Sequence, residues 1–282
     1  MPDLSGSTMF ISGASRGIGL AIALRAARDG ANVALIAKTA EPHPKLEGTI
    51  YTAASAIEEA GGQALPIVGD IRDEGSVNDA VAATVERFGG IDICVNNASA
   101  INLSGIETLD MKRYDLMQDI NTRGAFVVSK ACVPHLKGGR NPHILTLSPP
   151  ISLEPRWLAP HTAYTIAKYG MTLVALGLAA ELRDAGVASN ALWPRTLVAT
   201  AAVQNLLGGD EAMRRARSPE VYADAAYAIL TRPSAECTGN AFLCEDVLVE
   251  SGVTDLHRYS AAGADAELAV DLFVDGINPP GM

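Results

Sequence analysis

The sequence predicts one α/β domain built on a doubly wound, seven-stranded parallel sheet with helices on both faces. Two observations predict this fold class. Short apolar runs alternate regularly with longer amphipathic segments along the 282 residues, which is typical of repeated strand–helix–strand units. Several of the short runs are apolar almost throughout, as expected for parallel strands that are buried on both faces. Right-handed crossover connections then place helices on both sides of the sheet.

The expected elements follow in order along the chain. The seven expected strands are Thr8–Ser12, Asn32–Lys38, Ala64–Asp70, Ile91–Asn96, His143–Ser148, Val187–Trp193 and Asn240–Asp246. The expected helices lie near residues 17–29, 50–60, 74–88, 111–136, 160–184 and 219–230. Two irregular stretches interrupt the alternation: Thr39–Gly48 is expected as a loop, and Arg195–Arg217 as a mobile lid. We expect residues 1–252 to form the domain and residues 253–282 to form a C-terminal tail, packed on the domain or on a partner subunit.

Composition excludes several classes of protein. Hydrophobic residues make up 48% of the chain and charged residues 19%, which indicates a globular protein. The formal net charge of −10 argues against a nucleic-acid surface, which concentrates Lys and Arg. We expect no membrane span and no secretory signal, because no apolar stretch looks long and uncharged enough and Met1–Thr8 lacks a basic segment followed by an apolar run. The four cysteines form no CxxC clip and the five histidines lack paired ligand spacing, so we expect reduced thiols, a cytoplasmic location and no metal site.

The first expected strand runs into a helix through a glycine-rich turn. Glycines are needed where a backbone turns sharply or approaches a pyrophosphate, and the helix N-terminus favours the anion. Three glycines alone are a weak signal, but their place after the first strand of an alternating chain makes a Rossmann-type dinucleotide site the better interpretation. The residues expected to line the pyrophosphate are Gly13, Ser15, Arg16, Gly17, Ile18 and Gly19.

The end of the second expected strand bears on the choice of cofactor. NAD sites usually place a carboxylate there to hold the ribose diol. This chain instead has Ala37, Lys38 and Thr39, and Arg16 supplies a second cation from the glycine turn. These two cations suit a 2′-phosphate placed between Arg16 and Lys38, which favours NADP(H) as the cofactor. The alternative is that both cations are solvated surface residues.

Further motifs carry a resemblance to a known family. They are Asp70-Ile71, Asn96-Asn97-Ala98-Ser99, Asn121 and Tyr164-Thr-Ile-Ala-Lys168. Together with the glycine turn, they make residues 8–250 resemble the short-chain dehydrogenase/reductases. The segments Lys38-Thr-Ala-Glu-Pro-His-Pro-Lys-Leu and Leu147-Ser-Pro-Pro resemble the hydroxysteroid-dehydrogenase-like branch. Some members of that branch carry a sterol-carrier domain, for which this chain is expected to be too short.

The resemblance assigns acid–base chemistry to Tyr164 and Lys168. Residues four apart share one helix face, so both side chains can address one cofactor, although an ordinary helix pair has the same spacing. A free phenol has a pKa of about 10, and a neighbouring ammonium lowers it by favouring the phenolate. The phenol of Tyr164 can then exchange a proton with a carbonyl or alcohol oxygen while hydride moves to or from nicotinamide. In the family the lysine also bonds the nicotinamide ribose.

The resemblance extends to residues around this pair. It implies a proton-relay role for Asn121, for which a structural bond to backbone is the alternative. Asp70, with Ile71, is expected at the adenine edge, and Asn97 and Ala98 beside the adenosine ribose. Pro194, Thr196 and Val198, with Leu197 and Thr200, are expected near the nicotinamide.

Three positions depart from the family pattern. The serine that usually bonds the substrate oxygen aligns with Pro149, which cannot donate a hydrogen bond. Either Ser148 or Ser152 must then replace it, and Ser148 is preferred because it ends the fifth strand. Ser99 stands in place of a glycine. Arg195 also replaces a glycine, and it is expected either to grip a cofactor phosphate or acidic substrate or to lie at the surface.

The apolar segments suggest a substrate class and an assembly. Trp157 and Leu158, with Leu206 and Leu207, suggest a pocket for a bulky or lipid-like carbonyl; core or subunit contacts are the alternatives. The long apolar helices around Leu116–Leu136 and Tyr164–Leu182 resemble those that pair across subunits in the family. A homodimer or homotetramer is therefore expected, with burial of Met171, Leu173, Val174, Leu176 and Leu178 inside the monomer as the alternative.

These inferences lead to one preferred function and two rivals. The preferred function is an NADP(H)-dependent oxidoreductase that interconverts a carbonyl and a secondary alcohol on an apolar or lipid-like small molecule. Pro149 favours the first rival, an NADP(H)-binding sensor with impaired chemistry, whereas an intact Tyr164, Lys168 and Asn121 count against it. The second rival is a related epimerase or dehydratase, which would leave no net change in the cofactor.

Overall fold

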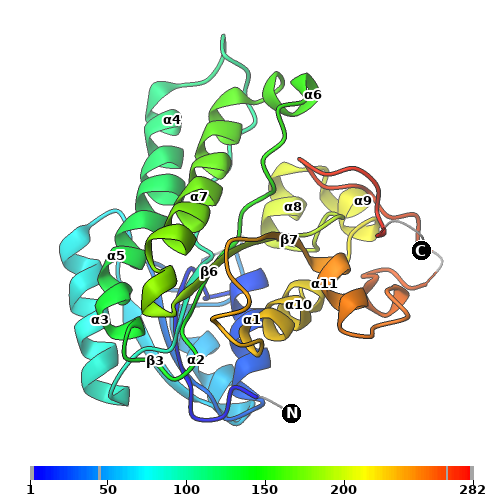
Figure 1. Ribbon diagram of the computed structural model, residues 1–282. Coiled ribbons are helices and arrows are strands. Elements are labelled where there is room, and N and C mark those ends of the chain that lie inside the picture. Colours follow the sequence, from blue (N-terminus) through cyan, green and yellow to red (C-terminus); the bar gives the residue numbers. More distant parts are fainter. Residues whose placement is uncertain (1–2, 44–45, 265, 280–282) are drawn as a thin grey trace.

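The protein contains one seven-stranded sheet, as the sequence predicts (Figure 1). The computed structural model describes residues 3–43, 46–264 and 266–279. The strands are β1 (Thr8–Ser12), β2 (Asn32–Ala37), β3 (Gln63–Val68), β4 (Ile93–Asn96), β5 (His143–Thr146), β6 (Ala188–Trp193) and β7 (Ala241–Leu243). They run parallel in the order β3-β2-β1-β4-β5-β6-β7. The order reverses direction between β1 and β4, and ligands of such sheets bind at the carboxyl ends of the strands beside that point.

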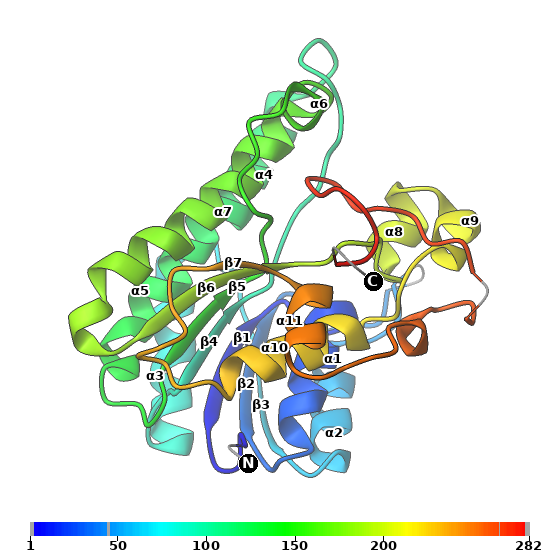
Figure 2. The same ribbon diagram turned by 45° about the vertical axis from the view of Figure 1, so that its right-hand side comes forward.

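Helices cover both faces of the sheet (Figure 2). They are α1 (Gly17–Ala27), α2 (Ile50–Glu59), α3 (Glu74–Phe88), α4 (Met111–Gln118), α5 (Gly124–Leu136), α6 (Pro155–Leu158), α7 (Thr162–Glu181), α8 (Ala201–Leu206), α9 (Gly209–Arg214), α10 (Glu220–Leu230) and α11 (Cys244–Glu250). One apolar core joins the sheet to α1, α2, α10 and α11, and a second joins it to α3, α5 and α7. Doubly wound α/β architecture is therefore confirmed.

Local sequence signals explain where several helices begin. The Asp73 side chain accepts backbone N–H groups at the start of α3, and Asp110 does so at the start of α4. Thr49 and Thr52 form a reciprocal capping box at the start of α2. These caps satisfy N–H groups that lack partners inside the helix.

Three expected elements differ from the sequence prediction. The helix expected over residues 111–136 is divided into α4 and α5 by a π-helical segment, Asp119–Arg123. The strand expected over Asn240–Asp246 ends at Leu243, and α11 starts directly afterwards. The lid expected over Arg195–Arg217 contains α8 and α9 and is tied down by a bridge between Val198 and Arg217. Part of the loop expected over Thr39–Gly48, Pro44 and Lys45, lies outside the described residues.

One helix corrects the expectation about membrane spans. By length and composition α7 could cross a membrane, with a mean hydropathy of 1.2 in its most apolar window. More than half of that window, 56%, is buried inside the protein. A core helix of a globular protein passes the same test, so the finding is weak evidence for a membrane span.

The C-terminal tail lies over the carboxyl ends of the last strands, near α8 in both views (Figures 1 and 2). Backbone hydrogen bonds hold it there, from Leu197 N to the Ala269 carbonyl (3.0 Å) and from Asp271 N to the Arg195 carbonyl (3.0 Å). Thr196 and Val270 form an antiparallel bridge between them. The described part of the tail therefore covers the segment that follows β6.

Candidate active site

The glycine turn after β1 has no space for side chains at two of its glycines. A Cβ atom at Gly13, where φ is +74°, would lie 2.8 Å from the Cα atom of Ala98. A Cβ atom at Gly19 would lie 2.5 Å from the Nδ2 atom of Asn97. Both distances are shorter than any real contact, so the turn requires glycine where β1, α1 and the end of β4 meet.

The residues after β4 hold this turn in shape. The Asn97 amide donates hydrogen bonds to the carbonyls of Ser12 (2.8 Å) and Gly13 (2.9 Å). The Ser12 hydroxyl in turn accepts the backbone N–H groups of Asn97 (3.2 Å) and Ala98 (3.1 Å). Asn96 also joins neighbouring elements, since its amide donates to the hydroxyls of Ser129 (2.9 Å) and Thr146 (3.2 Å).

A cavity of about 790 Å³ opens above the glycine turn. Its size is within the usual range for small-molecule and cofactor sites. It brings together most of the residues that the sequence assigned to a cofactor: Gly13, Ser15, Arg16, Gly17, Ile18, Lys38, Asp70, Ile71, Asn97, Ala98 and Thr200. The tight glycine turn and this lining fit a dinucleotide. Within the described ranges, no group of three or more His, Cys, Asp or Glu side chains could hold a metal ion.

Charged side chains gather at the end of the cavity beside β2 and β3. Lys38 Nζ lies 3.6 Å from Asp70 Oδ2, and the Arg72 guanidinium donates to both oxygens of the same carboxylate. These hydrogen bonds from Arg72 lower the pKa of Asp70 to about 2. Asp70 is therefore ionised and paired, and Arg72 is a partner that the sequence reasoning missed.

Arg16 has a structural role that the sequence did not indicate. Its Nε donates to the carbonyl of Glu47 (2.8 Å) and its Nη2 to the carbonyl of Gly48 (2.6 Å). The guanidinium thus ties the loop before α2 to the glycine turn. Arg16 is not simply a solvated surface cation, although it also lines the cavity.

Tyr164 and Lys168 lie on the buried stripe of α7. This stripe also contains Met171, Ala175 and Ala179, which recur at helical spacing. Tyr164 is 4% exposed and Lys168 is 3% exposed. The Lys168 ammonium donates to the carbonyl of Leu147 at the end of β5 (2.9 Å) and lies 5.0 Å from the centre of the Trp193 ring. The pair therefore sits at the carboxyl edge of β5 and β6.

Burial sets the proton affinities of this pair. It raises the pKa of Tyr164 above its ordinary value and lowers the pKa of Lys168 to about 7. The carboxyl group of Asp271, from the tail, is the second influence on both: it disfavours the phenolate and favours the ammonium. Burial also raises the pKa of Asp271 to about 7.

Comparison with known proteins decides the family. The family model for short chain dehydrogenases matches residues 7–209. The chain belongs to the short-chain dehydrogenase/reductase family. It is 56% identical to hydroxysteroid dehydrogenase-like protein 2 of Danio rerio over 97% of its own length and 65% of the relative's, so it spans slightly less than two thirds of that protein. The resemblance read from the sequence is confirmed.

Solved structures agree with this assignment. A short chain dehydrogenase from Mycobacterium thermoresistibile is 72% identical, has a TM-score of 0.94, and is matched over 99% of both chains. Carveol dehydrogenase from Mycobacterium avium, solved in complex with NAD, is 26% identical with a TM-score of 0.74 over 86% of this chain and 97% of the other. Both neighbours share the fold of this chain over most of its length.

Asn121 takes a structural position in this short-chain dehydrogenase. It is fully buried in the π-helical segment between α4 and α5. Its Oδ1 accepts from the Ala100 N–H (2.7 Å), and its Nδ2 donates to the Ala100 carbonyl (2.9 Å). The structural alternative is therefore present, and the relay role stays a prediction.

The hydroxyls of the two candidate serines, Ser148 and Ser152, have hydrogen-bond partners other than Tyr164. Ser148 is fully buried and its hydroxyl is hydrogen-bonded to Thr172 Oγ1 (2.9 Å), whose proton also has the Pro149 carbonyl as an acceptor (2.7 Å). The Ser152 hydroxyl accepts from the Glu154 N–H (3.3 Å). Thr172 was missed by the sequence reasoning, although its position one turn after Lys168 places it on the same face of α7.

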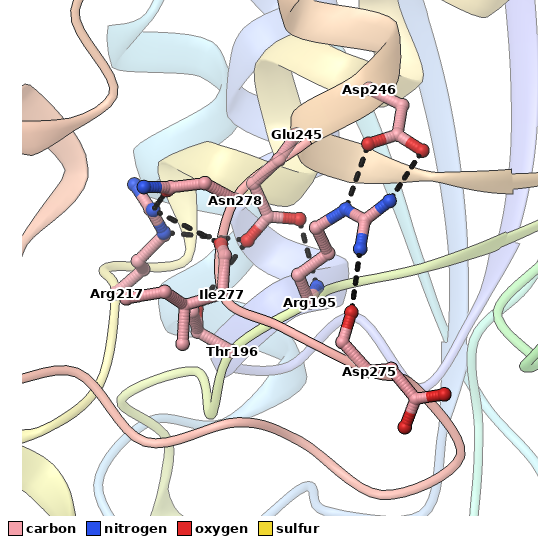
Figure 3. Close-up of polar contacts among 8 residues, drawn as sticks. All are labelled: Arg195, Thr196, Arg217, Glu245, Asp246, Asp275, Ile277 and Asn278. Atoms are coloured by element: carbon pink, nitrogen blue, oxygen red, sulfur yellow. Dashed lines mark hydrogen bonds and ion pairs between the residues drawn. The ribbon is translucent and has the colours of Figure 1, made fainter. Parts of the chain in front are cut away.

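The residues directly after β6, 194–198, do not face the cavity, and backbone bonds tie them to the tail. Pro194, Thr196 and Val198 are buried and do not line the cavity, so their expected contacts with nicotinamide stay predictions. Both expectations for Arg195 are wrong. Its guanidinium is nearly buried, donates to both oxygens of the half-buried Asp246 carboxylate (2.8 and 2.9 Å) and donates to the Asp275 carbonyl (3.0 Å) (Figure 3).

A fully buried ion pair, Arg217–Glu245, lies beside the Arg195–Asp246 pair. Arg217 and Glu245 are 1% and 0% exposed, with 3.3 Å between Nε and Oε1 (Figure 3). Glu245 also accepts the backbone N–H of Arg195 (2.8 Å), and Arg217 donates to Asn278 Oδ1 (2.9 Å) in the tail. Pairing explains why α11 starts where a strand was expected, since the helix turns Glu245 inward toward Arg217.

Proposed function

We propose that this protein is an NADP(H)-dependent oxidoreductase that interconverts a carbonyl and a secondary alcohol on an apolar small molecule. The observation that carries the proposal is the pairing of Tyr164 and Lys168 on one buried stripe of α7, at the sheet edge that bears the glycine turn. Ile101 lines the cavity and packs against the apolar cluster that contains Tyr164, so the two parts of the site adjoin.

Each residue has a role that follows from its chemistry. The N–H groups of the turn from Gly13 to Gly19 hold the pyrophosphate at the start of α1. Bound nicotinamide supplies or accepts the hydride. Tyr164 gives a proton to the carbonyl oxygen during reduction and takes one from the alcohol during oxidation. Lys168 favours the phenolate through its positive charge. Asn121 holds the backbone of Ala100 in place through two hydrogen bonds.

The preference for NADP(H) rests on the charges beside β2. The two residues that follow β2 are Lys38 and Thr39, and neither carries a carboxylate. Lys38 and Arg16 both line the cavity. NAD sites usually place an acid at this position. The wild-type protein is therefore expected to use NADPH with a kcat/KM at least about tenfold above that for NADH, which corresponds to about 1.4 kcal/mol.

Lys38→Glu is expected to reverse this preference. The new carboxylate repels a 2′-phosphate and can accept hydrogen bonds from a ribose diol. The measurement is kcat/KM for both nucleotides with a panel of ketones. Lys112→Glu, a reversal at an exposed position outside the cavity, is the control and should leave the ratio unchanged. Comparable turnover of wild type with NADH would overturn the assignment.

A binding role without chemistry is the second candidate. Pro149, at the position of the usual serine, favours this candidate. The neighbouring Ser148 hydroxyl is already hydrogen-bonded to Thr172. Tight binding of NADPH without turnover of any ketone or alcohol in the panel would support this candidate against the first.

An assembly through α5 and α7 is also proposed. Phe126 on α5 and Ile166 and Leu173 on α7 are large apolar side chains that are 52%, 48% and 60% exposed, whereas Met171 is buried inside the subunit. The two helices are neighbours, and large exposed apolar side chains gathered on neighbouring elements are typical of contact surfaces. Leu173→Glu is expected to convert a dimer or tetramer into smaller species in size-exclusion chromatography with light scattering. Ile106→Glu, in an exposed loop, should not; a wild-type monomer would contradict the proposal.

A further inference from the structure

The side chain of Phe273, from the tail, fills the centre of an aromatic cluster over Tyr164. It is 3% exposed. Its ring centroid lies 6.1 Å from that of Tyr164, and four other rings surround it at similar distances. They are Trp157 (6.2 Å), His161 (5.6 Å), Tyr169 (5.3 Å) and Trp193 (6.1 Å). Four of these five rings belong to residues 157–169 and the fifth, Trp193, ends β6; all five contact a single ring from the distant tail.

The backbone at Phe273 is held in an unfavourable conformation. Its φ of +70° is the only positive value at a non-glycine residue in the described part of the chain. Side chains with a Cβ atom adopt this region at a cost in free energy, and such strain is kept only where surrounding contacts impose it. The contacts here are the bonds from Trp193 Nε1 to the Leu272 carbonyl (2.9 Å) and from Arg195 to the Asp275 carbonyl (3.0 Å; Figure 3).

The position of the ring conflicts with the chemistry proposed for Tyr164. A substrate carbonyl must reach the phenol, whereas Tyr164 is 4% exposed and the Phe273 ring packs against its ring. Under the tail, burial also raises the pKa of Tyr164 and lowers that of Lys168, and the Asp271 carboxyl group further disfavours the phenolate. Acid–base catalysis by a phenol near neutral pH requires the opposite direction for Tyr164, a pKa below its ordinary value. The arrangement is therefore a resting one.

We propose that Phe273 occupies a substrate subsite beside Tyr164, and that the substrates carry a flat aromatic ring, one carbon away from the carbonyl, which takes its place. This inference rests on the proposed function and names its substrate class. Walls of aromatic side chains favour a flat ring in tilted or edge-to-face contact, as Phe273 itself makes. A dry apolar cavity left by the removal of a phenyl ring can bind benzene-like molecules. Gly276, with positive φ, directly follows residues 271–275, the part of the tail that must move aside.

Removal of the ring should strengthen binding of an aromatic ketone. Phe273→Ala and Phe273→Gly both remove the internal competitor, and the glycine variant also accepts the positive φ without strain. The matched control is Val274→Ala, which truncates the adjacent buried side chain. The probe is phenylacetone, with 2-butanone as the ketone that lacks a ring. Circular dichroism checks that each variant is folded.

Binding can be followed without turnover. The chain has two tryptophans, and both contact the Phe273 ring, so 5-fluorotryptophan labelling gives two fluorine NMR signals at this subsite. Phenylacetone is expected to shift these signals with a Kd about tenfold lower in both Phe273 variants than in wild type or Val274→Ala. The Kd of 2-butanone is expected to be the same in all four proteins.

Two results overturn the inference. Equal or weaker binding of phenylacetone by the Phe273 variants would mean that the ring is a wall of the pocket, and unshifted signals would place the ketone elsewhere. These failures differ from failure of the proposed function. Turnover of ketones by wild type, without tighter binding by the variants, would refute the subsite alone. Tighter binding without turnover of any ketone would refute the proposed chemistry and leave the subsite standing.

Discussion

Tyr164→Phe is expected to lower kcat for ketone reduction at least about a hundredfold, with little change in the affinity for NADPH. The substitution removes the phenolic hydroxyl, and general acid–base groups contribute about 10²–10⁴-fold to rate. The remaining ring fills the same buried space beside His161 and Phe273, so the fold is expected to persist. Steady-state kinetics gives kcat, and a fluorescence titration with NADPH gives the affinity.

Tyr169→Phe is the matched control for this prediction. Tyr169 lies on the same helix and contacts Phe273, but its hydroxyl donates to the carbonyl of Ser152 (2.8 Å). We expect this variant to keep kcat within about threefold, because the two neutral hydrogen bonds between this hydroxyl and the Ser152 backbone contribute about 1 kcal/mol each and serve the fold. Equal losses in the two variants would show that the chemistry does not depend on the phenol of Tyr164.

Glu245→Ala is expected to lower the free energy of unfolding by about 3–5 kcal/mol, the usual cost of removing one partner of a buried ion pair. The Arg217 guanidinium would remain buried without its carboxylate, and the backbone N–H of Arg195 would lose its acceptor. Urea denaturation followed by circular dichroism measures the change.

Glu250→Ala provides the comparison for an exposed ion pair. Glu250 is 59% exposed in its contact with Arg232 (3.3 Å), and such pairs contribute less than about 1 kcal/mol. The two substitutions therefore differ in burial and not in residue type. Similar effects of both would contradict the role assigned to the buried pair.

The parts of the structure that depend on local patterns could be predicted from the sequence. Parallel strands buried on both faces are apolar throughout, so runs such as Asn32–Ala37 are visible without any partner. The glycine turn is similarly local. An added Cβ atom at Gly13 or Gly19 would come closest to Ala98 or Asn97, and these two residues form a motif of their own directly after β4. The cavity residues followed from these two motifs.

The parts that could not be predicted depend on contacts between distant residues. Nothing in the spacing of Arg195 indicated that Asp246 would neutralise it, because the two meet only where the first turn of α11 lies beside the residue that follows Pro194. In the same way, Phe273 carries no local signal that a tail residue would pack on Tyr164. Asn121 was predictable as a polar helix residue, but its partner Ala100 required the π-helical turn.

Transfer of deuterium tests the central claim of hydride transfer assisted by Tyr164 most directly. Wild-type protein is mixed with an aromatic ketone and NADPH that carries deuterium at the transferable C4 position, and the alcohol is analysed by mass spectrometry and NMR. We expect the deuterium on the carbinol carbon of the product, with its rate of appearance lowered at least about a hundredfold in Tyr164→Phe. Label in the solvent, or an alcohol without deuterium, would contradict the account.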